Sequence, residues 1–154
     1  MSNYVSIAQE YINQGIAETS TTQKFPLGKI IQAVDKDTTL YGIGEFIYLK
    51  GVASTAVGEP VIYDLDAGTS TRAVAGSRGN IAIAMSANVA NQFGWYQISG
   101  TAVAKTGTVA SGARPYATST AGTLDDAVVS GDAIDNARYI TANGTPSEIG
   151  RAHV

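Results

Sequence analysis

The sequence predicts a mainly β protein, a small β-barrel or β-sandwich, and two observations carry this prediction. Residues 46–49 form an unbroken apolar run, mostly β-branched or aromatic, between Gly44 and Gly51. Such a run is typical of a short strand that is buried on both faces. Residues 81–85 alternate large and small apolar side chains, so one face of a strand can fill a core while the other allows close backbone approach.

The first element along the chain is expected to be a short helix. Val5 and Ile12 would share one face of a helix over residues 5–14, where we expect most of the helix of this protein. Ser6 begins a capping-box pattern, and Gly15 suits the end of the helix.

An arm is predicted to precede the β-rich domain. Residues 14–23 are polar and rich in Ser and Thr, which predicts a flexible linker. The chain therefore divides into an N-terminal arm and linker, 1–23, and a β-rich domain, 24–154, that should fold without the arm. Two uses of the arm stay open: its apolar side chains fold back on their own domain, or they dock on a neighbouring protein. In the second case the candidate partner-binding residues are Tyr4, Val5, Ile7, Tyr11 and Ile12.

Further strands complete the β-rich domain. We expect them at residues 29–34, 95–99, 127–129 and 138–142. Trp95, the single tryptophan, is predicted to be a core residue. Asn143-Gly144 is a strong turn signal, and the tail 145–154 is predicted to be a surface segment.

Short patterns within residues 41–88 recur weakly further along the chain. Gly58-Glu59-Pro60 resembles residues 112–115, and other short matches keep the same order at offsets of about 50 to 55 residues. These matches suggest an internal two-fold repeat with halves around 41–88 and 93–143. A chain rich in Gly, Ala, Thr and Val also matches itself readily, so both interpretations stay open.

Composition bounds the class of protein. A length of 154 residues suggests one domain, and 44% hydrophobic with 15% charged residues indicates an ordered chain with a weakly charged surface. The net charge of -3, with scattered basic residues, argues against a nucleic-acid partner. The absence of cysteine excludes disulfides and thiolate metal sites. The chain starts with no secretory signal and has no apolar run of roughly 18 residues, so we expect a soluble protein without a membrane partner, made in the cytoplasm.

No motif predicts catalysis, a cofactor or a metal site, and we expect a protein that is not an enzyme. His153, the only histidine, is next to last, where a catalytic triad or a metal site would depend on the tail. Asp64 and Asp66 have the spacing of two calcium ligands in an EF-hand loop, but the later glutamate of that loop is missing. A β-turn held by aspartate side chains is therefore the simpler interpretation. Residues 76–79 lack the ending of a phosphate-binding loop.

The middle half of the chain carries a set of turn and packing patterns. They are Gly44-Glu45 at a strand opening, Val57-Gly58 with Val61, the strand 81–84, and residues 94–98. In these patterns the chain resembles the small capsid decoration (cement) proteins of tailed bacteriophages. The resemblance implies a non-enzymatic virion protein that binds the outer surface of a phage head and stabilises the shell by bridging subunits of the major capsid protein. It also implies a homo-oligomer, with a trimer favoured, and an N-terminal arm that touches the shell. The segment from Thr106 onward departs from the smallest members of this family.

Three hypotheses about function follow. The first is capsid decoration. The second is a virion fibre, spike or carbohydrate-binding β module, because the eight tyrosines would suit a sugar-binding face, although tyrosines also serve β-proteins as half-buried strand residues. The third is a hydrolase that uses carboxylates alone, which the spacing of the 13 acidic residues does not favour.

Overall fold

The computed structural model describes residues 4–6, 14–37, 41–142 and 147–153. It is mainly β, with 41% strand and almost no helix, as the sequence predicts. None of the described residues belongs to a helix that is long and apolar enough to cross a membrane.

Five strands close into a barrel. β3 (Ile43–Gly51) pairs in parallel with β5 (Thr69–Arg72), and β5 pairs antiparallel with β4 (Pro60–Asp64). β4 then pairs with β6 (Asn80–Ala84), β6 with β7 (Phe93–Ala102), and β7 returns to β3. Alternate residues of four of these strands fill the barrel interior: Ile47, Leu49, Val61, Ala82, Ala84, Tyr96 and Ile98.

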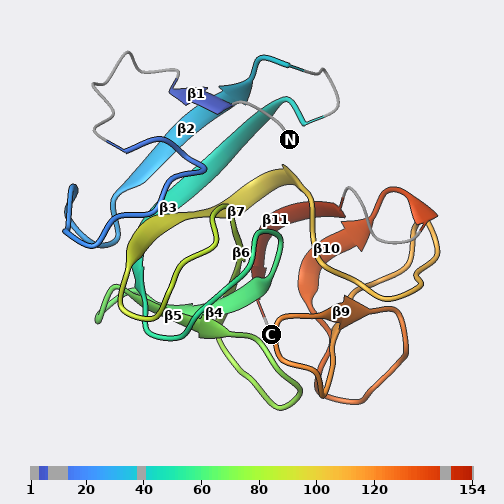
Figure 1. The fold of residues 1–154 in the computed structure, drawn as a ribbon. Coiled ribbons are helices and arrows are strands. Elements are labelled where there is room, and N and C mark those ends of the chain that lie inside the picture. The colour runs from blue at the N-terminus through green and yellow to red at the C-terminus, as the bar shows by residue number, and fades with distance from the viewer. Residues whose placement is uncertain (1–3, 7–13, 38–40, 143–146, 154) are drawn as a thin grey trace.

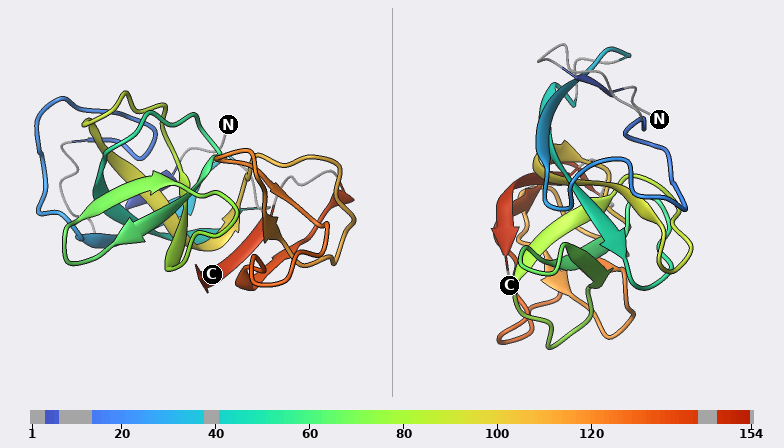
Figure 2. Two further views of the ribbon diagram at one scale, coloured as in Figure 1. Left: turned by 90° about the horizontal axis from the view of Figure 1, so that it is seen from below. Right: turned by 90° about the vertical axis from the view of Figure 1, so that its left-hand side faces the viewer.

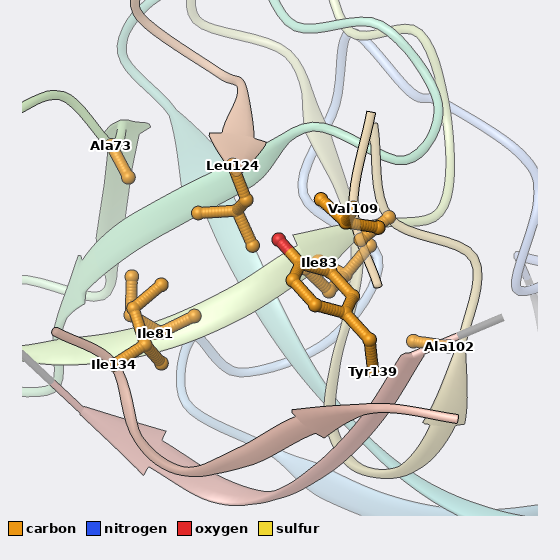
Figure 3. Packing of buried hydrophobic residues seen from close by; sticks show 9 residues of the cluster. Ala73, Ile81, Ile83, Ala102, Val109, Leu124, Ile134 and Tyr139 are labelled. Carbon is orange, nitrogen blue, oxygen red and sulfur yellow. The ribbon is translucent and has the colours of Figure 1, made fainter. Parts of the chain in front are cut away.

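Two further cores cover the outside of the barrel, which is why residues 46–49 of β3 and 81–84 of β6 are apolar at successive positions. An N-terminal core lies over β3 and β7 and contains Tyr4, Ile16, Ile31, Ala33, Phe46, Tyr48 and Trp95. A C-terminal core lies over β6 and contains Ala73, Ile81, Ile83, Ala102, Ala104, Val109, Leu124, Ile134 and Tyr139 (Figure 3). The alternation in β6 places its alanines in the narrow barrel and its isoleucines in the C-terminal core.

The sheet extends beyond the barrel at both ends. β2 (Ile30–Asp35) pairs with β3, and β1 (Tyr4–Ser6) pairs with β2. We call β1, β2 and residues 43–45 the wing. At the opposite end of the molecule lie β8 (Tyr116–Ala117), β9 (Leu124–Asp125) and β10 (Asp135–Tyr139), as Figures 1 and 2 show. β11 (Ser147–His153) joins β10 to β7.

Two hairpins, one in the middle of the chain and one in its C-terminal third, share one pairing register. In the β4–β5 hairpin Ile62 stands opposite Thr71, and in the β8–β9 pair Tyr116 stands opposite Asp125. Each member of the second pair lies 54 residues after its counterpart in the first. The same shift relates the weak sequence matches, while the boundaries 41–88 and 93–143 stay a prediction.

A glycine turn precedes the first strand of each hairpin. Gly58 and Gly112 have φ angles of 85° and 82°, where a side chain would be strained. The Gly58 N–H donates to Ala84 O at 2.8 Å, and the Gly112 N–H donates to Tyr139 O at 2.7 Å. The two turns therefore attach to the ends of β6 and β10 in the same way.

The predicted N-terminal helix is wrong where the structure describes it. Residues 4–6 form a strand, because the Tyr-Val pair finds a partner edge in β2, and such tertiary pairing overrides a weak local helix preference. The rest of the expected helix, 7–13, lies outside the described residues.

Three predictions about the C-terminal third are also corrected. Residues 127–129 are not a strand but an exposed connection, and the pairing falls earlier, in β9. The strand expected at 138–142 begins earlier, at Asp135. The tail, expected to be a surface segment, contains β11, which the open edge of β7 provides with a partner. The Asn143-Gly144 turn lies outside the described residues.

Candidate interaction surface

Asp64, Asp132 and Glu59 hold turns and joints of the fold. The Asp64 side chain accepts the N–H groups of Asp66 and Ala67 at 2.8 and 3.2 Å, which confirms the aspartate-held turn. Asp132 accepts the Gly76 N–H at 2.8 Å and faces the Arg78 guanidinium at 3.5 Å. No group of three or more potential metal ligands occurs among the residues that the structure describes.

Glu59 is the most deeply buried carboxylate with ionic partners, at 3% exposure. It joins the barrel to the C-terminal segments, because Arg72 and Lys105 reach it at 2.9 and 3.1 Å and Arg72 also donates to Ala121 O. Burial alone would raise the pKa of Glu59, but the Ala56 N–H and the two cations outweigh it and hold the pKa below its ordinary value. With its oxygens taken by these partners, the charged group serves as a structural joint.

The tyrosines do not gather on one open face. Tyr4, Tyr48, Tyr96 and Tyr139 are buried, and the other described tyrosines, Tyr41, Tyr63 and Tyr116, are half-buried. Burial raises the pKa of Tyr48, and burial with nearby Asp125 and Asp126 raises that of Tyr139. Tyr11 lies outside the described residues. This distribution is that of ordinary strand tyrosines.

The segment expected to be a flexible linker is instead a packed strap over the N-terminal core. We use strap for residues 14–20. Gln14 is 2% exposed, and its amide nitrogen donates to Glu18 O and Phe93 O at 2.8 and 2.9 Å. Its carbonyl groups accept on both sides: Tyr48 Oη donates to the side-chain oxygen at 2.7 Å and Trp95 Nε1 to the backbone oxygen at 3.0 Å.

The other end of the strap is fixed to the barrel as well. Ser20 and Phe93 exchange two backbone hydrogen bonds of 3.0 and 2.8 Å. Removal of residues 1–23 would therefore uncover Tyr48 and Trp95, and we expect it to destabilise the domain, contrary to the prediction from sequence.

Of the five candidate partner-binding residues, the structure describes two. Tyr4 folds back on its own domain: it is buried, its ring lies 4.7 Å from that of Phe46, and its hydroxyl donates to Thr101 O at 3.3 Å. Val5 is half-buried in the wing. Ile7, Tyr11 and Ile12 lie outside the described residues, so their docking on a partner stays a prediction.

The wing presents an apolar face that the sequence analysis missed. Val5, Val34 and Ile43 stand directly opposite one another across the three strands and therefore share one face. Ile43 is 60% exposed, and Ile30 is exposed on the same face of β2. Residues two apart on a strand point the same way, so Gln32 of β2 and its opposite residue Glu45 of β3 form a polar pair on this face, between Ile30 and the Val34–Ile43 pair.

The wing also ends in an open strand edge. Within the described ranges β1 pairs with β2 alone and is the last strand of the sheet on that side. The last strand of a sheet is where an extended segment of a partner can add by backbone pairing. Apolar face and open edge together make the wing the candidate interaction surface.

Comparison of the chain with protein-family models, with curated proteins and with solved structures finds no match.

Proposed function

We propose that this chain is a structural virion protein that binds the outer surface of a tailed-bacteriophage head and stabilises the shell by bridging subunits of the major capsid protein. The observation that carries the proposal is the wing, with its open β1 edge and the exposed Ile43 and Ile30. A partner segment that adds to this edge gains backbone hydrogen bonds, and the neighbouring face with Ile30 and Ile43 offers the rest of that partner apolar surface to bury. The resemblance of the middle half of the chain to cement proteins supports the same partner.

The closed barrel supports this role from the other side. The core inside the barrel and the two cores on its outside form the packed body to which the wing is attached. If the chain acts as a trimer, three wings bind one particle, and each attachment raises the effective concentration of the others.

The test is sedimentation of the protein with heads that lack it. Ile43→Lys places a charge on the wing face, and Val128→Lys is the matched control because Val128 is 81% exposed and lies in the connection between β9 and β10, outside the wing. We expect wild type and V128K to pellet with heads and to raise the temperature at which the heads break open. I43K should stay largely in the supernatant while it unfolds at the same temperature as V128K.

Two outcomes would contradict the proposal at different levels. Failure of the wild-type protein to bind any head would refute capsid decoration, and a glycan array would then examine the carbohydrate-binding alternative. Equal binding by wild type and I43K would keep the decoration role and remove the wing from it.

A further inference from the structure

A pocket begins at β1, the last strand of the sheet. Tyr4 and Val5 are neighbours on β1 and therefore point to opposite faces of the sheet. Val5 lies on the apolar face of the wing, whereas Tyr4 belongs to the N-terminal core. Tyr4 also lines a pocket of about 330 Å³. The pocket therefore lies on the side of β1 opposite the apolar face of the wing.

The other wall of this pocket belongs to the barrel. Val57 lies before β4, Met85 directly follows β6, and Val103 directly follows β7. Val57 and Val103 are 42% and 41% exposed, so they form a rim that is open to solvent. A partner that covers the rim would remove this apolar surface from water, which stabilises the complex. The lining also includes Tyr41, Ala84 and Gln97.

A strand that adds to β1 brings its side chains to this pocket. Residues directly opposite one another on paired strands share a face, and their Cβ atoms lie about 4.5–5.5 Å apart. The partner residue opposite Tyr4 therefore points to the pocket side, next to a side chain that lines the pocket. The next partner residue, opposite Val5, points to the other side and extends the row of Val5, Val34 and Ile43.

The lining decides which side chain suits the pocket side. None of the described residues that line it is charged, so a charged anchor would lose water without gaining an ion pair. A large apolar anchor would be buried against the valines of the rim. Apolar cavities of about 150 Å³ already hold a benzene molecule, so the volume of this pocket admits one large apolar side chain.

We propose that the segment of the capsid protein that adds to β1 is apolar at successive positions, with one large apolar side chain in the pocket beside Tyr4. The side chain opposite Val5 covers the other face. This inference rests on the proposed function, because it names the chemistry of the partner that the wing binds. Backbone pairing gives such a complex affinity, and the pocket gives it specificity for one segment.

Charged variants of the rim test the pocket in the whole protein. Affinity for heads that lack the protein is measured by sedimentation over a range of protein concentrations. Val57→Lys places an ammonium group where the anchor should exclude water, and we expect binding at least about tenfold weaker than that of wild type. Val57→Met keeps the rim apolar and should bind like wild type, as should Val128→Lys. Val103→Lys repeats the test from the other side of the rim.

The variants must unfold at the temperature of wild type for their affinities to be compared. Should V57K fail this condition, V103K decides the question, because Val103 is equally exposed. Wild-type affinity in the folded rim variants would overturn the inference. It would leave the proposed function in place, since wild type would still bind heads.

Hydrogen exchange of free and head-bound protein tests the pairing with β1. We expect β1, residues 54–58 and residues 101–105 to gain protection together. Protection of β1 without the other two segments would overturn the pocket, and protection of those segments without β1 would overturn strand addition. The segment of the capsid protein that gains protection should contain at least three successive apolar residues, and a charged segment there would contradict the inference. Failure of wild type to bind any head is a different result, which removes the proposed function and this inference with it.

Discussion

Replacement of Gln14 by alanine is the sharpest test of the strap. The substitution removes three side-chain hydrogen bonds, two donated by its amide nitrogen and one accepted from Tyr48 Oη. Phe93 O keeps the Ser20 N–H as a donor, but the buried Tyr48 hydroxyl loses its only acceptor among these contacts. The Tyr48 hydroxyl oxygen keeps the Lys24 N–H as a donor, so its unused O–H costs about 1–2 kcal/mol, and the lost bond to Glu18 O adds about 1 kcal/mol.

We therefore expect Gln14→Ala to lower the free energy of unfolding by about 2–3 kcal/mol. For a chain of this length that change lowers Tm by about 5–10 °C, measured by thermal unfolding followed by circular dichroism. Gln23→Ala is the matched control, because Gln23 is exposed and makes one bond, to Phe25 O. Its effect should stay within about 0.5 kcal/mol.

A double-mutant cycle isolates the contact itself. Tyr48→Phe removes the hydroxyl that donates to Gln14 at 2.7 Å, so the double variant should be less destabilised than the sum of the single variants by about 1 kcal/mol. Additive effects, or a loss below about 0.5 kcal/mol for Gln14→Ala, would refute the packed strap and restore the flexible linker.

Three other predictions concern the cores and the charged joint. Trp95→Ala should destabilise by about 3–5 kcal/mol in urea titration because the indole is fully buried, and a loss under about 1 kcal/mol would place the ring outside the core. Glu59→Gln should lower the free energy of unfolding by about 1–2 kcal/mol at pH 7. The pKa of Glu59 in the folded protein lies below the ordinary 4.5, so the stabilisation from its charge is present above pH 4.5 and is lost as pH falls through the folded pKa. When unfolding is measured across pH, the variant should therefore lose less stability than wild type on the acid side. The raised pKa of Tyr139 stabilises the fold below pH 10.0 and loses its effect as pH rises through the folded pKa. Tyr139→Phe should flatten that alkaline loss, and an unchanged profile would assign it to other groups.

The strands at the centre of the fold were predictable from sequence because the spacing of apolar residues along a strand indicates which of its faces are buried. A strand covered on both faces must be apolar at successive positions, as residues 46–49 are. The alternation of large and small apolar side chains in residues 81–85 predicted a strand with two unlike faces. In the structure one face lies in the barrel interior and the other in the C-terminal core. Trp95 and the aspartate-held turn at Asp64 were predictable for the same local reason.

The candidate interaction surface was only partly predictable. Tyr4 and Val5 were singled out by their apolar character, yet Tyr4 lies in the N-terminal core and the exposed positions are Ile30 and Ile43. The pattern of residues 30–34 shows two faces, but nothing local says that one of them extends past the barrel and stays uncovered.

The sequence by itself determined the class of the fold, the strands of its centre and its buried tryptophan. The tertiary structure alone decided barrel closure through the parallel β3–β5 pair, the place of β11, and the conversion of a polar segment into the strap. The physical reason is the range of the interactions. Periodicity records which face of a segment avoids water, whereas Gln14 is buried only because Tyr48 and Trp95, distant along the chain, offer its carbonyl groups their donors.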